Sequence, residues 1–99
     1  MNKTEHLLIC IMEECAEIQQ ACAKALRFGL DDGHPDRDST NADDIIREYA
    51  DLQAVIQMLL ESESCINLSN LEAKIEKKKQ KVNDFMKYAE SRGTLKDQD

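Results

Sequence analysis

Residues 29–40 read GLDDGHPDRDST and interrupt two long helical patterns. The stretch contains two of the three glycines of the chain and its single proline, which are the residues that most often end helices. It is acidic, but it lacks the alternating oxygen ligands, the central glycine and the closing glutamate of an EF-hand calcium loop. The sequence therefore predicts a polar loop between two helices.

On both sides of this loop, apolar residues recur at steps of three and four, which is typical of an amphipathic helix. The first pattern predicts a helix over residues 4–28, with Thr4 as its N-cap and Gly29 just after its end. The second pattern predicts a helix over residues 40–61. With the loop between them, these two helices are expected to pack against each other.

A third helix is expected to start at Ser69, where Ser69-Asn70-Leu71-Glu72 fits a capping box, and to end before Gly93. Residues 1–93 are interpreted as a single domain and residues 94–99 as a disordered tail. The predicted fold class is all-α, an antiparallel bundle of three main helices per chain. Because 99 residues with 4% aromatics make only a thin core, we expect oligomerisation to complete the bundle.

Composition excludes several classes of protein. The chain has 20 acidic and 13 basic residues and a net charge of −7, which argues against a general nucleic-acid binder. Its apolar runs are far shorter than the ~20 residues that span a bilayer, and no signal peptide is recognisable. The four cysteines form no Cys-x-x-Cys pair, so we interpret them as reduced, mostly buried thiols of a cytoplasmic protein.

Four carboxylates lie where the helical pattern expects a core. At ~100° per residue, Glu14 and Glu48 fall inside the apolar arcs of their helices, and Glu17 and Asp51 fall at the edges. Each pair is spaced i, i+3 and shares one helix face. Buried carboxylates are costly unless they are paired or bind a metal, and oxygen ligands alone suit Mg²⁺ or Mn²⁺. The alternative is that each is an ordinary solvated residue or a salt-bridge partner.

The order and spacing of these acids also resemble a known family. Residues 13–17, Glu-Glu-Cys-Ala-Glu, match Glu-Glu-x-x-Glu, and residues 48–51, Glu-Tyr-Ala-Asp, match Glu-x-x-Asp on the next helix. Together with residues 24–32, they resemble the short, single-domain MazG-like proteins of the all-α nucleotide pyrophosphohydrolase superfamily, which are often phage-encoded. The resemblance covers about residues 5 to 60.

The resemblance implies a Mg²⁺-dependent enzyme that cleaves a nucleoside triphosphate between its α and β phosphates, giving a monophosphate and pyrophosphate. Carried over by position, the metal ligands would be Glu14, Glu17, Glu48 and Asp51. Glu13 matches the first glutamate of the motif but points away from the other four. Its expected role is to position water or to contact a neighbouring subunit of a homodimer or homotetramer.

One position departs from the resemblance, because many relatives carry a lysine one turn before Glu-x-x-Asp, where this chain has Asp44. Asp44 is then a further metal or water ligand, or the phosphate charge is met by Lys24, Arg27 or Arg47. Lys24 is the best placed of these bases. For each of the three, the alternative is an ordinary surface cation with no role in binding. Asn41 is a candidate for binding a base or sugar, with helix N-cap as its structural alternative.

Two other functions are compatible with the same sequence. The first is a non-catalytic helical oligomer that binds a nucleotide or a partner protein and retains the acidic cluster as a structural site. The second is the same hydrolytic chemistry on another pyrophosphate, such as an alarmone or phosphoribosyl-ATP. Base and sugar preference depend on loops and neighbouring subunits, and they stay open at this stage.

Overall fold

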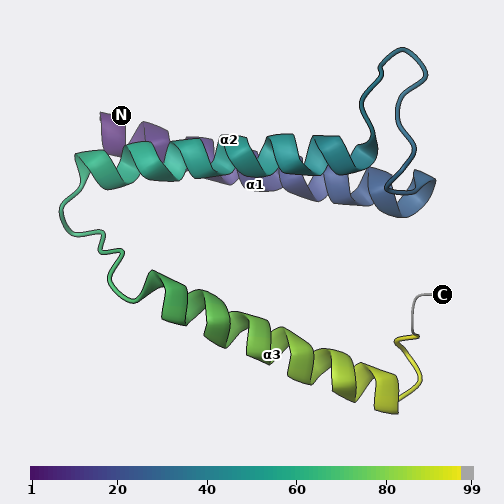
Figure 1. Cartoon of the computed structure of the whole chain (residues 1–99). Coiled ribbons are helices and arrows are strands. Elements are labelled where there is room, and N and C mark those ends of the chain that lie inside the picture. Colours follow the sequence, from purple (N-terminus) through teal and green to yellow (C-terminus); the bar gives the residue numbers. More distant parts are fainter. Residues whose placement is uncertain (97–99) are drawn as a thin grey trace. The chain divides into compact units, whose positions relative to one another are not determined.

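A computed structural model describes residues 1–96 and shows three helices: α1 (Lys3–Phe28), α2 (Asn41–Ser62) and α3 (Leu71–Ser91) (Figure 1). Over these residues there is no strand, so the predicted all-α class is confirmed. Nowhere in residues 1–96 does a helix combine the length and apolarity needed to cross a bilayer. The disorder predicted for residues 97–99 lies outside the described residues.

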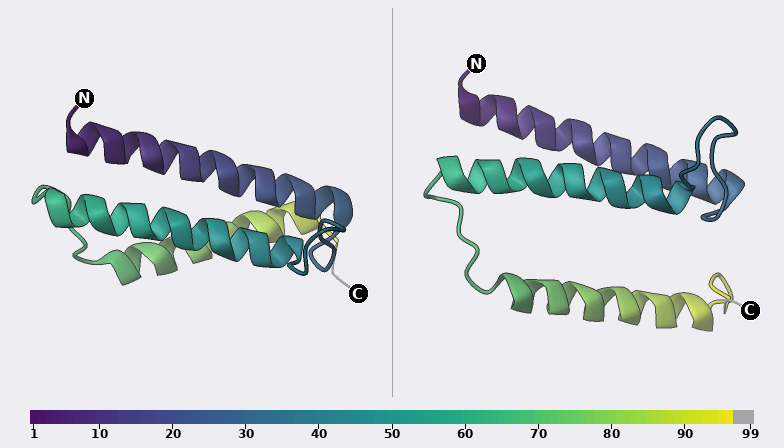
Figure 2. Two further views of the ribbon diagram at one scale, coloured as in Figure 1. Left: turned by 90° about the horizontal axis from the view of Figure 1, so that it is seen from above. Right: turned by 45° about the horizontal axis from the view of Figure 1, so that its top comes forward.

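The helices α1 and α2 form an antiparallel hairpin along their whole lengths (Figures 1 and 2). At the open end of the hairpin, the Thr4 hydroxyl donates a hydrogen bond to Glu63, which follows α2. Within the described part of the chain, the buried apolar side chains are Leu7, Ala21 and Leu59. The hairpin core is therefore small, as the length of the chain predicts.

The closed end of the hairpin is held by caps on both helices. Gly29 ends α1 with a φ of 98°, a left-handed conformation that favours glycine, and its N–H bonds to the Ala25 carbonyl. Thr40 caps α2, because its hydroxyl accepts from the Asp43 N–H while the Asp43 carboxylate accepts from the Thr40 N–H. This reciprocal pair is a capping box. Asn41 is therefore the first residue of α2 and is not its N-cap.

Two other predicted caps are wrong. The N-cap of α1 is Asn2, whose side chain accepts from the Glu5 N–H, and it takes the place predicted for Thr4. At α3 the N-cap is Asn70, which has a φ of 64° and makes no side-chain capping bond. The capping box predicted at Ser69 does not form, because the left-handed turn at Asn70 delays the start of the helix to Leu71.

The loop between α1 and α2 is bonded to itself across its base. The Asn41 N–H donates to the Asp32 carbonyl at 2.6 Å, and the Asn41 amide donates to the Gly29 carbonyl at 2.8 Å. Inside the loop, the backbone of Gly33 passes close to Ser39, so that a Cβ at position 33 would lie 2.2 Å from the Ser39 carbonyl oxygen. Gly33 is thus required by a close backbone approach.

The chain divides into two compact units, the hairpin unit Met1–Ile66 and a second unit that begins at Asn67 and contains α3. In the second unit, α3 buries no side chain over its described length, and Thr94 turns back to bond the Ala89 carbonyl. The single domain predicted over residues 1–93 stays a prediction.

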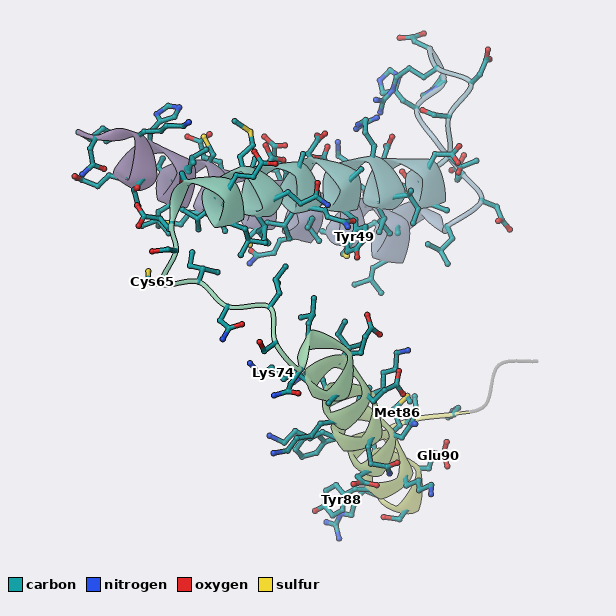
Figure 3. All side chains as sticks on the ribbon, turned by 60° about the vertical axis from the view of Figure 1, so that its left-hand side comes forward. Tyr49, Cys65, Lys74, Met86, Tyr88 and Glu90 are labelled. Carbon is teal, nitrogen blue, oxygen red and sulfur yellow. The ribbon has the colours of Figure 1, made fainter. Side chains whose placement is uncertain are left out.

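The hairpin exposes apolar side chains that the helical pattern had placed on its buried stripes. Tyr49, labelled in Figure 3, is 56% exposed, and Cys15 and Cys22 are exposed free thiols. The prediction that the cysteines are mostly buried is therefore wrong for the single chain. The physical reason is that two helices cover only one face of each other, so the residues beside that face stay open.

Candidate functional site

The acidic cluster consists of Glu14 and Glu17 on α1 and of Glu48 and Asp51 on α2. One carboxylate oxygen from each residue can be chosen so that all four lie within 4.8 Å of one another. The i, i+3 spacing places each pair on one face of its helix, and the hairpin brings the two faces together. The structure thus gathers the four residues predicted to bind a metal.

Burial is uneven within the acidic cluster. Glu14 and Glu48 are half-buried, whereas Glu17 and Asp51 are exposed. Among the side chains of residues 1–96, no hydrogen-bond partner is found for the buried oxygens Glu14 Oε2 and Glu48 Oε2. A buried carboxylate oxygen without a partner is destabilising, so these two atoms mark where a ligand is needed.

The crowding of negative charge changes the acidity of the cluster. The hydrogen bond that protonated Glu17 donates to Glu48, together with the charges of Glu14 and Glu48, raises the pKa of Glu17 to about 7. Near pH 7, Glu17 is therefore only partly ionised, whereas an isolated glutamate would be fully ionised. Two buried oxygens without partners and a glutamate that resists ionisation both indicate that the negative charge of the four carboxylates is not balanced by the chain. The donor set therefore fits a hard divalent ion.

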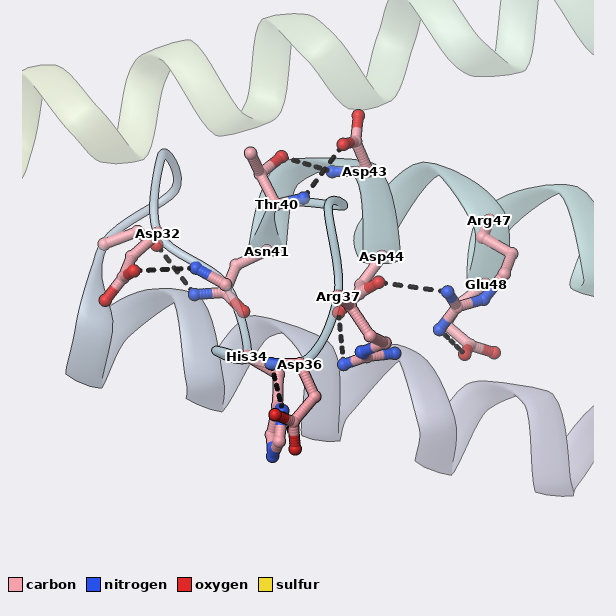
Figure 4. Close-up of polar contacts among 12 residues, drawn as sticks. Asp32, His34, Asp36, Arg37, Thr40, Asn41, Asp43, Asp44, Arg47 and Glu48 are labelled. Carbon is pink, nitrogen blue, oxygen red and sulfur yellow. Dashed lines mark hydrogen bonds and ion pairs between the residues drawn. The ribbon is translucent and has the colours of Figure 1, made fainter.

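One turn before Glu48, the carboxylate of Asp44 is paired with two arginines (Figure 4). Arg47 Nη1 lies 3.0 Å from Asp44 Oδ1, and Arg37 Nη2 lies 3.5 Å from Asp44 Oδ2. The Asp44 side chain is only 8% exposed. We call these three residues the arginine pair and its aspartate. Asp44 is not among the four residues whose carboxylate oxygens lie within 4.8 Å of one another, and both of its own oxygens are paired with arginines of this chain.

Arg47 links this arrangement to the acidic cluster. Its second terminal nitrogen, Nη2, lies 3.2 Å from Glu48 Oε1. This hydrogen bond to Glu48, followed by the charge of Asp44, raises the pKa of the Arg47 guanidinium above its usual range. Arg47 thus touches one carboxylate of each group, and it stays charged throughout the physiological pH range.

Two hollows open on the hairpin unit beside these residues. One, of about 310 Å³, lies among Glu17, Glu48, Asp44, Lys24, Arg37 and Arg47. The other, of about 400 Å³, is lined by Phe28, His34, Pro35 and Asn41, and it shares Lys24 and Arg37 with the first. Both volumes lie within the ~300–1,000 Å³ range of small-molecule sites.

The remaining predicted site residues take different places. Glu13 is exposed and stays outside the acidic cluster, as expected from its position on the helix. Lys24 lines both hollows, and Asn41 lines the larger one while it also bonds the loop. Arg27 lies over the Phe28 ring, 5.3 Å from its centre, and lines neither hollow.

Arg37 was missed by the sequence analysis. It lies in the irregular loop, where helical spacing says nothing about direction. A signal was nevertheless present, because Arg37 is the only lysine or arginine among four aspartates in residues 29–40. A lone base in an acidic loop beside an acidic helix is a candidate partner for a buried carboxylate.

Comparison with known protein families, with curated proteins and with solved structures finds no match for this chain.

Proposed function

We propose that the chain is a Mg²⁺-dependent nucleotide pyrophosphohydrolase of the MazG-like type, which hydrolyses a (deoxy)nucleoside triphosphate to the monophosphate and pyrophosphate. The observation that carries this proposal is the acidic cluster, in which four carboxylates from two helices meet within 4.8 Å and two buried oxygens lack partners. Glu14, Glu17, Glu48 and Asp51 would hold the ion, with Mn²⁺ as a possible substitute.

A divalent ion bound there would neutralise phosphate charge and acidify a bound water. The chain itself supplies the surroundings that such a substrate needs. Lys24, Arg37 and Arg47 line the hollow beside the cluster, so cations face the place where phosphate groups would lie. The larger hollow has a more apolar lining, with Phe28 and Pro35, which suits the flat face of a base. The two hollows share Lys24 and Arg37, so one ligand can occupy both.

The proposal includes assembly of the chain into a homodimer or homotetramer. The hairpin buries few side chains and exposes large apolar ones on both helices, including Met12, Ile46 and Tyr49. A second copy of the same chain would cover such a surface and enlarge the core. Light scattering coupled to size-exclusion chromatography tests this directly, and a monomer at micromolar concentration would contradict it.

The activity is tested by incubating the protein with canonical and modified nucleoside triphosphates and Mg²⁺ and by measuring pyrophosphate release. Glu48→Gln, which keeps the shape of the side chain but removes its charge, is the matched control. Turnover by the wild type that is lost in Glu48→Gln supports the proposal. Failure of all substrates, with the two proteins indistinguishable, would refute it. Nucleotide binding without turnover would identify a non-catalytic binding oligomer instead.

A further inference from the structure

The arginine pair and its aspartate have more positive charge than Asp44 requires. Asp44 carries one negative charge, whereas Arg37 and Arg47 carry two positive charges between them. Arg47 also contacts Glu48, but Arg37 reaches no other carboxylate among the described ion pairs. The side chains of Arg37 and Arg47 are 46% and 52% exposed, and both line the hollow beside the acidic cluster. A guanidinium has five N–H donors, and most of those in this pair are therefore free to bind an anion.

Burial of Asp44 fixes the positions of these donors. Its carboxylate is 8% exposed and receives one arginine on each oxygen, so moving either guanidinium away would leave a buried charge partly unpaired. Arg37 comes from the loop and Arg47 from α2, and Asp44 is the residue that holds them together (Figure 4). Such an arrangement lowers the entropy that two long side chains lose when they bind a ligand.

Both guanidinium groups line the same hollow as Glu17 and Glu48 of the acidic cluster. We propose that Asp44 is a positioning residue that holds Arg37 and Arg47 as a clamp for the polyphosphate part of the substrate, next to the ion held by the acidic cluster. Guanidinium groups bind phosphate oxygens in a forked geometry, which matches this chemistry. This inference rests on the proposed function for its substrate, and it adds the residues that bind the phosphates and the one that orients them.

The test measures binding and needs no turnover. Isothermal titration calorimetry with inorganic triphosphate and Mg²⁺ compares the wild type with Arg37→Gln, Asp44→Asn and the double variant. Arg37→Gln and Asp44→Asn are each expected to weaken binding about tenfold. Because Asp44 acts through Arg37 and Arg47, the double variant is expected to lose little beyond the larger single loss. Arg37→Lys, which keeps the charge without the fork, is expected to restore part of the affinity.

Lys3→Gln is the charge-matched control, since Lys3 lies at the opposite end of α1 from Lys24. Its affinity for triphosphate is expected to stay within about twofold of the wild type. Arg37→Gln should leave the affinity for Mg²⁺ alone unchanged, which separates the clamp from the metal site. If Asp44→Asn does not fold at the assay temperature, the series Arg37, Arg37→Lys, Arg37→Gln decides the question by itself.

Several results would overturn the clamp. The first is that the wild type fails to bind triphosphate, and the second is that Arg37→Gln weakens binding no more than Lys3→Gln does. The third is that the losses from Arg37→Gln and Asp44→Asn multiply in the double variant, which would show that the two residues act independently. A non-hydrolysable nucleoside triphosphate serves as a second probe and should show the same ranking. Binding that follows this ranking without any turnover would refute the proposed hydrolysis and leave the clamp standing. Turnover with no dependence on Arg37 would refute the clamp alone.

Discussion

Asp44 is buried and Glu48 is half-buried, and the two carboxylates lie one turn apart on α2. They differ in how their negative charge is balanced. Both oxygens of Asp44 face arginines of the same chain, and its side chain is 8% exposed. Glu48 is 12% exposed and has one oxygen near Arg47, while in the described chain its other oxygen is left without a partner. The two carboxylates lie at similar depth on the same helix. The charge of Asp44 is balanced by arginines of the chain, whereas the charge of Glu48 is only partly balanced and leaves room for a cation from solution.

The difference between Asp44 and Glu48 is tested most strongly by replacing each carboxylate in turn with its neutral amide. Glu48→Gln removes one carboxylate of the acidic cluster, and under the proposed function we expect pyrophosphate release to fall more than about 100-fold, chiefly in kcat. Asp44→Asn removes the residue that positions the arginines, and we expect about a tenfold rise in KM with a smaller change in kcat. Steady-state kinetics at saturating Mg²⁺ measures both values. Equal effects of the two variants on kcat would contradict the distinction between the two regions.

The proposed Mg²⁺ site gives the next largest difference. At a Mg²⁺ concentration of about 100 times its Kd, the wild type should gain about 2.7 kcal/mol of stability, measured by thermal or urea unfolding. Glu48→Gln should lose most of this gain, because it lacks one ligand. Asp44→Asn should keep it, because Asp44 is already paired with arginines. K⁺ at matched ionic strength controls for screening, and a gain of the same size with K⁺ would argue against a metal site.

The capping box of Thr40 and Asp43 lies in the first turn of α2, next to Asp44 and before the acidic cluster. Thr40→Ala removes the hydroxyl that accepts from the Asp43 N–H and should lower the free energy of unfolding by about 1 kcal/mol. The relative positions of the four carboxylates in the acidic cluster should not change, so Mg²⁺ affinity is expected to stay the same. Ser39→Ala, one residue earlier, is the matched control. A parallel loss of Mg²⁺ affinity in Thr40→Ala would show that the two regions are coupled.

The smallest expected effect is a pH dependence of stability without metal. The pKa of Glu17 is raised to about 7, so the folded chain binds a proton more tightly than the unfolded chain does. Stability without Mg²⁺ should therefore fall as pH rises from about 4.5 to 7, and the fall should end above that range. The effect is small because Glu17 is exposed to solvent. Glu17→Gln should flatten this part of the curve, and an unchanged slope in that variant would assign the dependence to another group.

Helical periodicity explains why the acidic cluster was predictable and the clamp was not. The angular positions of Glu14 and Glu48 follow from the helix pattern, and the loop over residues 29–40 allows the two helices to pack as antiparallel neighbours. Arg37 lies in an irregular segment, so its direction depends on the bonds that close the loop around Asn41. The partners of Asp44 were therefore visible only once the backbone path of the loop was known.

The helix caps were also predictable only in part from the sequence. Gly29 was predicted correctly because only a residue that tolerates positive φ fits the end of α1. Around α3, the pattern Ser69 to Glu72 matched a capping box, but the left-handed turn at Asn70 moved the start of the helix. The exposure of Tyr49 and Cys22 depends on which face the neighbouring helix covers, and a single helical pattern does not specify this.

The close approach at Gly33 fixes the path of the loop but not the side chains that follow it. Any side chain at position 33 would collide with the Ser39 carbonyl, so the path of the loop tolerates no substitution there without a shift of the backbone. His34 and Pro35 follow immediately and line the larger hollow, yet they are exposed and unconstrained by that contact. Substitutions at these two positions would therefore change the lining of the larger hollow, while the close approach at Gly33 keeps the path of the loop.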